Sequence, residues 1–473
     1  MIEFNGVDFL RELNPNKAVK ERRLRKGKIK MEQTIQKETV QLKAIPIKID
    51  YAFLLHLALN VMLSVLIVLG LRFNAAFTWV AFVINALSYV IMSKSGIVFN
   101  VIYMMSFSVI YKGAPETTSF FTILECLAVI FLFFKEEKLY LSKGFFFAML
   151  LCGGYLVVSC YLAHALDVIT IFKQLIFIAF LYLAVRNFDK KNMWKYVFFY
   201  ALGVFVSSVV ALFADKIPNF YEFIHKSIHS PQILNRFTGL NGDPNYYSIN
   251  LIVGLMGVFA FYNHWQARIP FWVLYFSFFY FGIEAFSRSF ILMYALFTVF
   301  MAAYFIAKKR YQSLGFLTII IVIAIGFLGR DERVIALMER FVKQGSLNNF
   351  TTGRSDTWVT YLKYIFVNPK VLLMGVGLCS PILNEMGTHN LYIECLYFLG
   401  VIGSALYLAT IVFALNIKKK ELKGKQGRSF LIAFFPFLMM YFFLQGLFSH
   451  EFIVHILLSY VIFQKIKRVE KKK

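Results

Sequence analysis

The polar segment at residues 330–388 reads RDERVIALMERFVKQGSLNNFTTGRSDTWVTYLKYIFVNPKVLLMGVGLCSPILNEMGT, and an apolar run lies on each side of it. The run before it, SLGFLTIIIVIAIGFLG, covers residues 313–329, and the run after it, HNLYIECLYFLGVIGSALYLATIVFALN, covers residues 389–416. A connection of this length needs a reason, because long loops are usually functional or disordered. Its aromatic residues and its glycine-rich turn argue against disorder. We therefore interpret this segment as half of an active site.

Apolar runs of the same kind recur along most of the chain. Of its 473 residues, 59% are hydrophobic and 18% are aromatic, and the mean hydropathy is +0.65. Ordinary soluble domains are only about 45–50% apolar. The runs are about 17–22 residues long, which is the length that a helix needs to cross ~30 Å of hydrocarbon. They are continuous rather than alternating, and this favours helices over a barrel. The sequence predicts an all-α, polytopic transmembrane helix bundle.

We expect about 12–14 membrane spans, each taken from one apolar run. The candidate spans are residues 51–71, 75–92, 96–111, 118–134, 143–162, 168–186, 195–214, 246–262, 270–286, 289–307, 313–329, 389–416, 429–447 and 450–466. They divide the chain into a basic tail at 1–50, a transmembrane domain at 51–466 and a second basic tail at 467–473. Two long loops, 215–245 and 330–388, interrupt the transmembrane domain.

The distribution of charge predicts the orientation. Lys and Arg total 50 against 26 Asp and Glu, which gives a formal net charge of +24. In membrane proteins such cations concentrate in the cytoplasmic connections. Basic residues crowd the short connections at 135–143, 186–195 and 417–428, so we place these and both tails inside. The loops 215–245 and 330–388 then lie outside. We expect a multi-pass protein of the plasma membrane with an extracytoplasmic active site.

The N-terminal tail carries the basic stretch RRLRKGKIK at residues 22–30. We interpret residues 1–50 as a cytoplasmic tail that rests on anionic lipid. A nucleic-acid-binding or docking arm is the alternative. Since the bias of cations toward cytoplasmic connections explains most of the charge, we expect a lipid membrane and no nucleic acid as a partner.

Turn-forming residues end the first outer loop. The motif Asn-Gly-Asp-Pro-Asn at residues 241–245 predicts a turn that leads into a helix, with Asn245 or Tyr246 in its first turn. A helix N-terminus can bind an anion, because its unpaired N–H groups and dipole favour negative charge. A plain structural turn is an equal interpretation.

Three arginines on the predicted outer face are candidate anion ligands. Arg236 precedes the turn, Arg288 lies between two spans, and Arg354 begins a predicted helix in the long loop. A guanidinium group binds phosphate oxygens through two parallel hydrogen bonds and keeps its charge in a low dielectric. Snorkelling at the membrane surface explains any one of them alone. Three on one face favour a diphosphate ligand.

His389 and Asn390 begin the span that follows the long loop, and Glu394 lies one turn later. Imidazole titrates near neutral pH, so His389 is a candidate general base. A structural histidine at a helix start is the alternative. Glu394 is an acid inside an apolar run, so it should face a polar cavity or pair with a cation. An orienting contact from Glu394 to His389 is a further hypothesis.

The sequence gives little support for a metal or a cofactor. Its five cysteines form no CxxC pair. His225 and His229 are spaced like a pair of metal ligands, but no third ligand lies nearby. The phosphate-binding and dinucleotide-binding glycine motifs are also missing. We predict no metal and no cofactor.

Several short motifs follow one another along residues 236–407. They are Arg236-Phe-Thr-Gly239 with Pro244-Asn245, then Ser287-Arg288, Gly353-Arg354 with Trp358, Asn368-Pro369 with Gly375 and Gly377, and His389-Asn390 with Gly400 and Gly403. In their order, spacing and outer placement these motifs resemble the O-antigen ligase and O-antigen polymerase superfamily of membrane proteins.

The resemblance implies metal-independent glycosyl transfer with inversion at the outer face of the membrane. The donor would be a glycan on undecaprenyl diphosphate. Arg236, Arg288 and, less closely matched, Arg354 would hold the diphosphate, and His389 would deprotonate the acceptor hydroxyl. His389 and Arg288 are the implied catalytic residues, and Asn245 and Asn390 join the substrate-binding set. An acceptor glycan and other polysaccharide-assembly proteins are the implied partners.

Ligase and polymerase differ only in the acceptor. The Lys-, Ile- and Phe-rich composition is typical of low-GC, Gram-positive sources, which lack a lipopolysaccharide core. We therefore favour polymerisation of capsule or exopolysaccharide repeat units, with a ligase that uses a different acceptor as the alternative. A lipid-linked glycan flippase or transporter is the alternative from another class. Transporters often contain internal repeats, and none is visible here.

Overall fold

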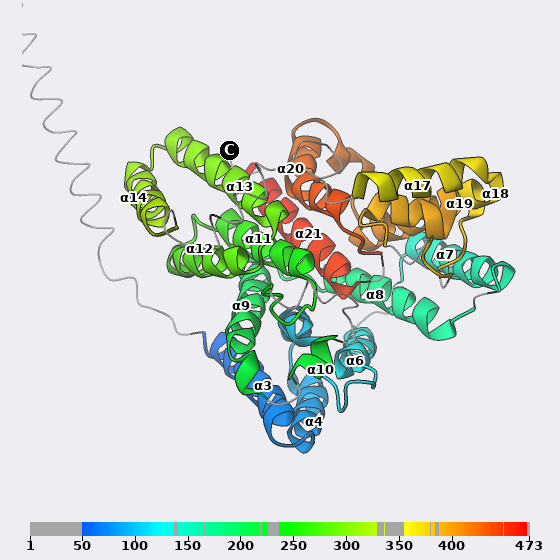
Figure 1. The fold of residues 1–473 in the computed structure, drawn as a ribbon, viewed down its shortest axis with the longest axis horizontal. Helices are drawn as coiled ribbons and strands as arrows, with labels where there is room; N and C mark the ends of the chain where they lie inside the picture. Colours follow the sequence, from blue (N-terminus) through cyan, green and yellow to red (C-terminus); the bar gives the residue numbers. More distant parts are fainter. Residues whose placement is uncertain are drawn as a thin grey trace, which may run out of the picture. The chain divides into compact units, whose positions relative to one another are not determined.

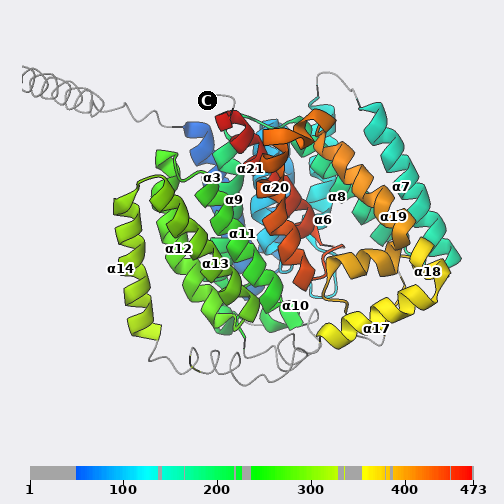
Figure 2. The ribbon, with the colours of Figure 1, turned by 90° about the horizontal axis from the view of Figure 1, so that it is seen from above.

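The protein is an α-helical bundle, drawn in Figures 1 and 2 from the computed structural model. The structure describes residues 50–136, 141–164, 166–217, 220–225, 236–328, 335, 354–378, 380–383, 387–447 and 449–470. The bundle described below belongs to the compact unit within residues 56–473. Apart from Asp50, the predicted basic tail lies outside the described residues, as does the loop from 336 to 353.

The described residues contain helices and turns but no strand. The predicted all-α class is therefore confirmed. The helices, including short 3-10 helices marked η, are α3 (Tyr51–Arg72), α4 (Ala76–Ile91), α5 (Lys94–Met104), η1 (Met105–Phe107), α6 (Phe120–Phe134), α7 (Lys143–Leu162), α8 (Val168–Arg186), α9 (Met193–Leu212), η2 (Ala214–Lys216), α10 (Phe220–His225), α11 (Pro244–Ala260), α12 (Trp265–Glu284), α13 (Arg288–Ala307), α14 (Tyr311–Leu328), α17 (Arg354–Val367), α18 (Pro369–Met374), α19 (Leu391–Leu415), η5 (Lys419–Leu422), α20 (Gly424–Met440), η6 (Tyr441–Phe443) and α21 (His450–Glu470).

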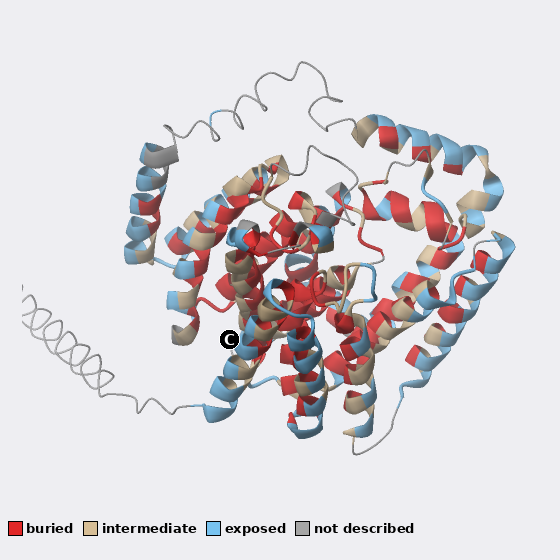
Figure 3. Cartoon of the chain, turned by 60° about the horizontal axis from the view of Figure 1, so that its bottom comes forward, coloured by how far each residue is buried: buried red, intermediate tan, exposed pale blue. Residues whose placement is uncertain are grey.

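Six of the described helices are long and apolar enough to cross a membrane: α3, α7, α8, α9, α13 and α19. The chain is thus a multi-pass membrane protein by helix length and composition. Each of the other predicted spans also falls on a helix, but these helices are shorter or carry more polar residues. The outward faces of the peripheral helices are exposed and apolar, as at Leu87, Leu151 and Val299. Figure 3 shows buried residues concentrated in the middle of the bundle. Lipid is the solvent that such exposed apolar faces require.

The last helix, α21, forms the centre of the bundle. It packs against α8, α9, α11 and α20, and Figure 1 shows it between these elements. Its stretch from Phe452 to Phe463 is buried throughout, as expected for a helix that is apolar on all sides. The one histidine in this stretch, His455, lies 2.7 Å from the Tyr200 hydroxyl and 2.9 Å from the Tyr441 hydroxyl. Both ring nitrogens are therefore hydrogen-bonded, as a buried imidazole requires, and His455 has a structural role.

A break divides α19 at Gly400, where φ is 62° and ψ is −174°. The break frees carbonyl groups from the helical ladder, and neighbouring segments satisfy them. Val376 N donates to Tyr397 O at 2.8 Å, and Gly377 N donates to Phe398 O at 3.1 Å. The Tyr155 hydroxyl of α7 bonds the carbonyl of Leu399 at 2.6 Å. Irregular backbone is tolerated at membrane depth only where protein satisfies it in this way. The predicted span at 389–416 is thus two helical pieces, which Figure 2 shows at an angle.

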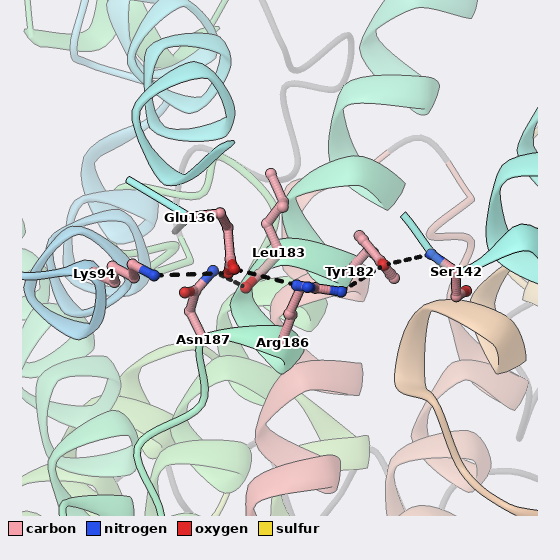
Figure 4. Close-up of polar contacts among 7 residues, drawn as sticks. All are labelled: Lys94, Glu136, Ser142, Tyr182, Leu183, Arg186 and Asn187. Atoms are coloured by element: carbon pink, nitrogen blue, oxygen red, sulfur yellow. Dashed lines mark hydrogen bonds and ion pairs between the residues drawn. The ribbon is translucent and has the colours of Figure 1, made fainter. Parts of the chain in front are cut away.

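Charged residues form a network at the end of the bundle that holds the connections 135–143 and 186–195. Glu136 lies 3.4 Å from Arg186 Nε and 3.9 Å from Lys94 Nζ. Arg186 also donates to the Tyr182 hydroxyl at 3.4 Å, and that hydroxyl accepts from Ser142 N at 3.0 Å. Figure 4 shows these side chains in a row, which ties the start of α5 and the end of α8 to Glu136 after α6 and Ser142 before α7. The sequence predicts that this end is cytoplasmic.

Candidate functional site around the start of α11

The segment that leads into α11 is fixed to the turn between α12 and α13. The Arg236 guanidinium donates to Ala285 O at 3.0 Å and to Phe286 O at 3.1 Å. Phe237 N donates to Glu284 O at 3.1 Å. The sequence predicts that Arg236 binds an anion. In the structure at least two of its N–H groups donate instead to backbone carbonyls of the protein. Its observed contacts make it an anchor that holds this segment against α13.

Asp243 begins α11. Its carboxylate accepts from Asn245 N at 2.7 Å and from Tyr246 N at 3.0 Å, and Pro244 occupies the first helical position. An acidic N-cap followed by proline is a strong helix start. The predicted start with Asn245 and Tyr246 in the first turn is confirmed. The sequence allowed two interpretations of this N-terminus, an anion-binding site or a plain structural turn. The Asp243 carboxylate already accepts the amide hydrogens that an anionic ligand would bind, so these contacts favour the structural turn.

The starts of α11 and α13 contact each other. Ser287 donates to the Asn245 side-chain oxygen at 3.3 Å and caps α13 by accepting from Phe290 N at 3.4 Å. Arg288 is the first residue of α13 and is half-buried. Asn245, predicted to bind substrate, thus helps to fix the helix start that carries Arg288.

Arg354 joins this group from the long loop. It begins α17, as predicted, and is half-buried. Burial lowers the pKa of its guanidinium, Asp243 raises this pKa, and Arg288 lowers it. Arg354 therefore interacts electrostatically with one carboxylate and one guanidinium from segments that are 66 or more residues away in the sequence.

His389 adjoins the same group. Its pKa lies below the ordinary 6.5 because burial and the positive charge of Arg354 lower it, whereas Asp243 raises it. Its backbone is in the left-handed region with φ of 45°, which is uncommon for a residue other than glycine. Trp358 of α17 holds the preceding residue by donating to Thr388 O at 2.9 Å. An imidazole that stays neutral near neutral pH is suited to accept a proton.

Asn390 caps α19. Its side-chain oxygen accepts from Tyr392 N at 2.9 Å and from Ile393 N at 3.1 Å, and the residue is buried. Its predicted role in substrate binding stays a prediction. Glu394 was suggested to orient His389. Its carboxylate instead accepts from Gly446 N at 2.7 Å and from Leu447 N at 3.0 Å. It therefore fixes the segment before α21 to α19.

The sequence analysis did not predict that Asp243 and Tyr246 influence the charged residues of the candidate site. Both influence the pKa of Arg354, and the Tyr246 hydroxyl donates to Gln445 O. The Asp-Pro pair before an apolar run indicated the helix cap, but the sequence held no signal that this carboxylate would act on the distant Arg354.

The other histidines are structural or lie partly outside the described residues. His450 Nδ1 lies 2.8 Å from the buried carboxylate of Glu125, so this acid inside an apolar run has a partner. His225 ends α10, and His229 lies outside the described residues. Among the residues that the structure describes, no group of three or more His, Cys, Asp or Glu side chains is arranged to hold a metal ion.

Comparison with family models, with curated proteins and with solved structures finds no match to this chain. The resemblance to O-antigen ligases and polymerases therefore rests on the quoted motifs. The lengths and composition of the described helices support a multi-pass helical membrane protein.

Proposed function

We propose that the protein is a membrane glycosyltransferase, which transfers a glycan from undecaprenyl diphosphate to an acceptor sugar hydroxyl at the extracytoplasmic face of the plasma membrane. By composition, its task is the polymerisation of capsule or exopolysaccharide repeat units. One observation carries the proposal: Arg288, Arg354 and His389 come from three segments that are distant in sequence, yet Arg288 acts electrostatically on Arg354 and Arg354 on His389. Cations beside a neutral imidazole match the two tasks of this reaction.

The first task is to stabilise the leaving group. When the bond between the anomeric carbon and the diphosphate breaks, negative charge develops on the diphosphate oxygens. Preorganised cations at that position lower the barrier electrostatically. Arg288 and Arg354 take this role, and Arg236 holds the turn that carries Arg288 through its bonds to the carbonyls of residues 285 and 286.

The second task is to activate the acceptor. The neutral His389 imidazole takes the proton of the acceptor hydroxyl while the hydroxyl oxygen forms a bond to the anomeric carbon from the face opposite the diphosphate. The electron pair of the broken bond leaves with undecaprenyl diphosphate. The configuration at the anomeric carbon inverts, and the step balances without a metal, a nucleotide or a cofactor.

A reconstituted reaction tests this proposal. Purified protein in detergent receives a lipid-diphosphate-linked repeat unit without added metal, and the products are separated by length. We expect a ladder of longer lipid-linked glycans, which His389→Ala and Arg288→Ala abolish. Arg268→Ala is the matched control, because Arg268 is exposed at the opposite end of α12 from the anchored turn.

The other outcomes separate the alternatives. Transfer to a different acceptor without a ladder identifies a ligase. The absence of both products, together with lipid movement across liposomes that tolerates both substitutions, identifies a flippase or transporter and contradicts the proposed glycosyl transfer.

A further inference from the structure

A cavity of about 500 Å³ lies among the start of α8, α17 and the first part of α19. Thr388, the residue before His389, belongs to its lining, together with Asp167 and Thr170 at the start of α8, Tyr361 of α17, Glu394 of α19 and Gln445. Its volume lies within the ~300–1000 Å³ that is usual for small-molecule sites. The proposed reaction, as described above, assigns no ligand to this cavity.

The lining has the donors and acceptors of a hydroxyl-binding site. Asp167 and Glu394 supply carboxylates that only accept when ionised, and Thr170 and Gln445 supply groups that both donate and accept. Hydrogen bonds from Thr170 lower the pKa of the Asp167 carboxyl, so this group is ionised at neutral pH. Tyr361 is buried and hydrogen-bonded to Leu383 N at 3.1 Å, which fixes its ring in the wall.

Charge separates this cavity from the arginine group. Among its described lining residues there is no lysine or arginine, whereas Arg288 and Arg354 influence each other electrostatically near the start of α11. The ionised Asp167 carboxylate repels a diphosphate and attracts hydroxyl donors. His389 directly follows Thr388 of this lining in the chain, and the charge of Arg354 shifts its pKa.

We infer that this cavity is the acceptor subsite: it binds the terminal sugar of the acceptor glycan and presents one hydroxyl to His389. The assignment rests on the proposed glycosyl transfer and adds to it the place and the class of the acceptor. The sugar bound there is neutral or an N-acetylated amino sugar, since the carboxylate of a uronic acid would be repelled by the ionised Asp167.

Binding of a free saccharide tests the subsite without the donor. The probe is the repeat unit released by mild acid from the lipid-linked glycan of the producing cell, and saturation-transfer NMR with the full-length protein in detergent measures its dissociation constant. Thr170→Trp fills the cavity from α8, and we expect it to weaken binding at least about tenfold, the equivalent of ~1.4 kcal/mol. Thr318→Trp, on the exposed face of α14, is the matched control and should bind like the wild-type protein.

A second variant guards against misfolding of the first. Asp167→Asn removes the charge but keeps a side chain that caps helices equally well, and we expect it to weaken binding severalfold with an unchanged melting temperature. An unchanged dissociation constant in both variants, or no binding of the probe to the wild-type protein, overturns the assignment.

The two proposals fail in different ways. If the wild-type protein builds a glycan ladder and Thr170→Trp leaves the acceptor KM unchanged, glycosyl transfer stands and the subsite is wrong. If the probe binds and Thr170→Trp weakens its binding, but no ladder or transfer product forms, the cavity is a saccharide site and the proposed transfer is wrong.

Discussion

At the scale of single residues, the candidate site combines groups with opposite effects on one imidazole. Burial and Arg354 lower the pKa of His389, and Asp243 raises it. The carboxylate of Asp243 also supports the charge of Arg354. Because Asp243 is fixed by two backbone amides at the start of α11, it keeps its position without a ligand. A bound diphosphate would neutralise part of the arginine charge and so change the proton affinity of His389.

This arrangement predicts the pH dependence of the transfer reaction. A lowered pKa keeps His389 neutral to lower pH, and the active base is lost only as pH falls through that pKa. We expect the acid limb of kcat/KM to lie below pH 6.5, the ordinary value for histidine. Arg354→Gln removes a positive charge, so it should move this limb to higher pH, whereas Arg268→Gln should not. Initial rates across pH measure both. A limb above pH 6.5 that ignores Arg354→Gln contradicts His389 as the titrating base.

A second prediction concerns Asn390, whose side chain accepts two amide hydrogens at the start of α19. Asn390→Ala removes the cap and should cost about 1 kcal/mol of stability. Asn390→Asp keeps an acceptor of similar size and should retain most of that stability. Thermal unfolding in detergent compares the two variants. Equal melting temperatures for Asn390→Ala and the wild type would show that the cap contributes nothing.

At the scale of elements, the break in α19 decides where His389 lies. The first piece of the helix begins at Leu391, two residues after His389, and Val376 and Gly377 donate to two of the carbonyls that the break releases. Gly375 and Gly400 meet backbone to backbone: a Cβ at Gly400 would lie 2.5 Å from Gly375 N and Leu373 O. The end of α18 and the break in α19 are therefore one packed unit, and any larger side chain there disturbs the helix that follows His389.

The corresponding prediction is that Gly400→Ala lowers stability by at least about 2 kcal/mol, since it combines a left-handed backbone with a clash. Gly154→Ala on the exposed face of α7 is the control, because nothing lies within 4 Å of a Cβ there. Alanine in a helix is favoured over glycine by roughly 0.5–1 kcal/mol, so this control should be neutral or stabilising. Thermal unfolding and folded yield measure both variants. A Gly400→Ala protein as stable as Gly154→Ala would contradict the described packing.

At the scale of the whole molecule, the two ends of the bundle differ in chemistry. One end holds the ion pairs of Lys94, Glu136 and Arg186. The other holds the starts of α11 and α13, where the candidate site lies. The bias of cations toward cytoplasmic connections predicts that the first end faces the cytoplasm. The proposed reaction requires that the second end face the outside.

Thiol labelling of intact cells tests this orientation. Lys191→Cys and Asp356→Cys place a thiol at exposed positions of the two ends, in a protein whose native cysteines are replaced by serine or alanine. A membrane-impermeant maleimide should label Asp356→Cys in intact cells and Lys191→Cys only after permeabilisation. The reverse pattern would place the candidate site in the cytoplasm and contradict the proposed extracytoplasmic transfer.

The sequence by itself determined the local features of this protein. Continuous apolar runs indicated helices, because only a helix satisfies its backbone in lipid within one segment, and each predicted span falls on a helix. Turn chemistry likewise indicated the starts of α11 and α17. Such features depend on neighbours within a few residues, so the pattern along the chain is sufficient to predict them.

Only the tertiary structure decided the features that depend on distant residues. It showed that Arg236 anchors the turn after α12, that Glu394 binds the segment at 446–447, and that Asp243 interacts electrostatically with Arg354. It also showed that α19 is broken at Gly400, because α18 and Tyr155 supply the donors that a break requires. These outcomes follow from packing between segments far apart in the chain, and a hydrogen bond or a charge acts across space whatever the separation in sequence.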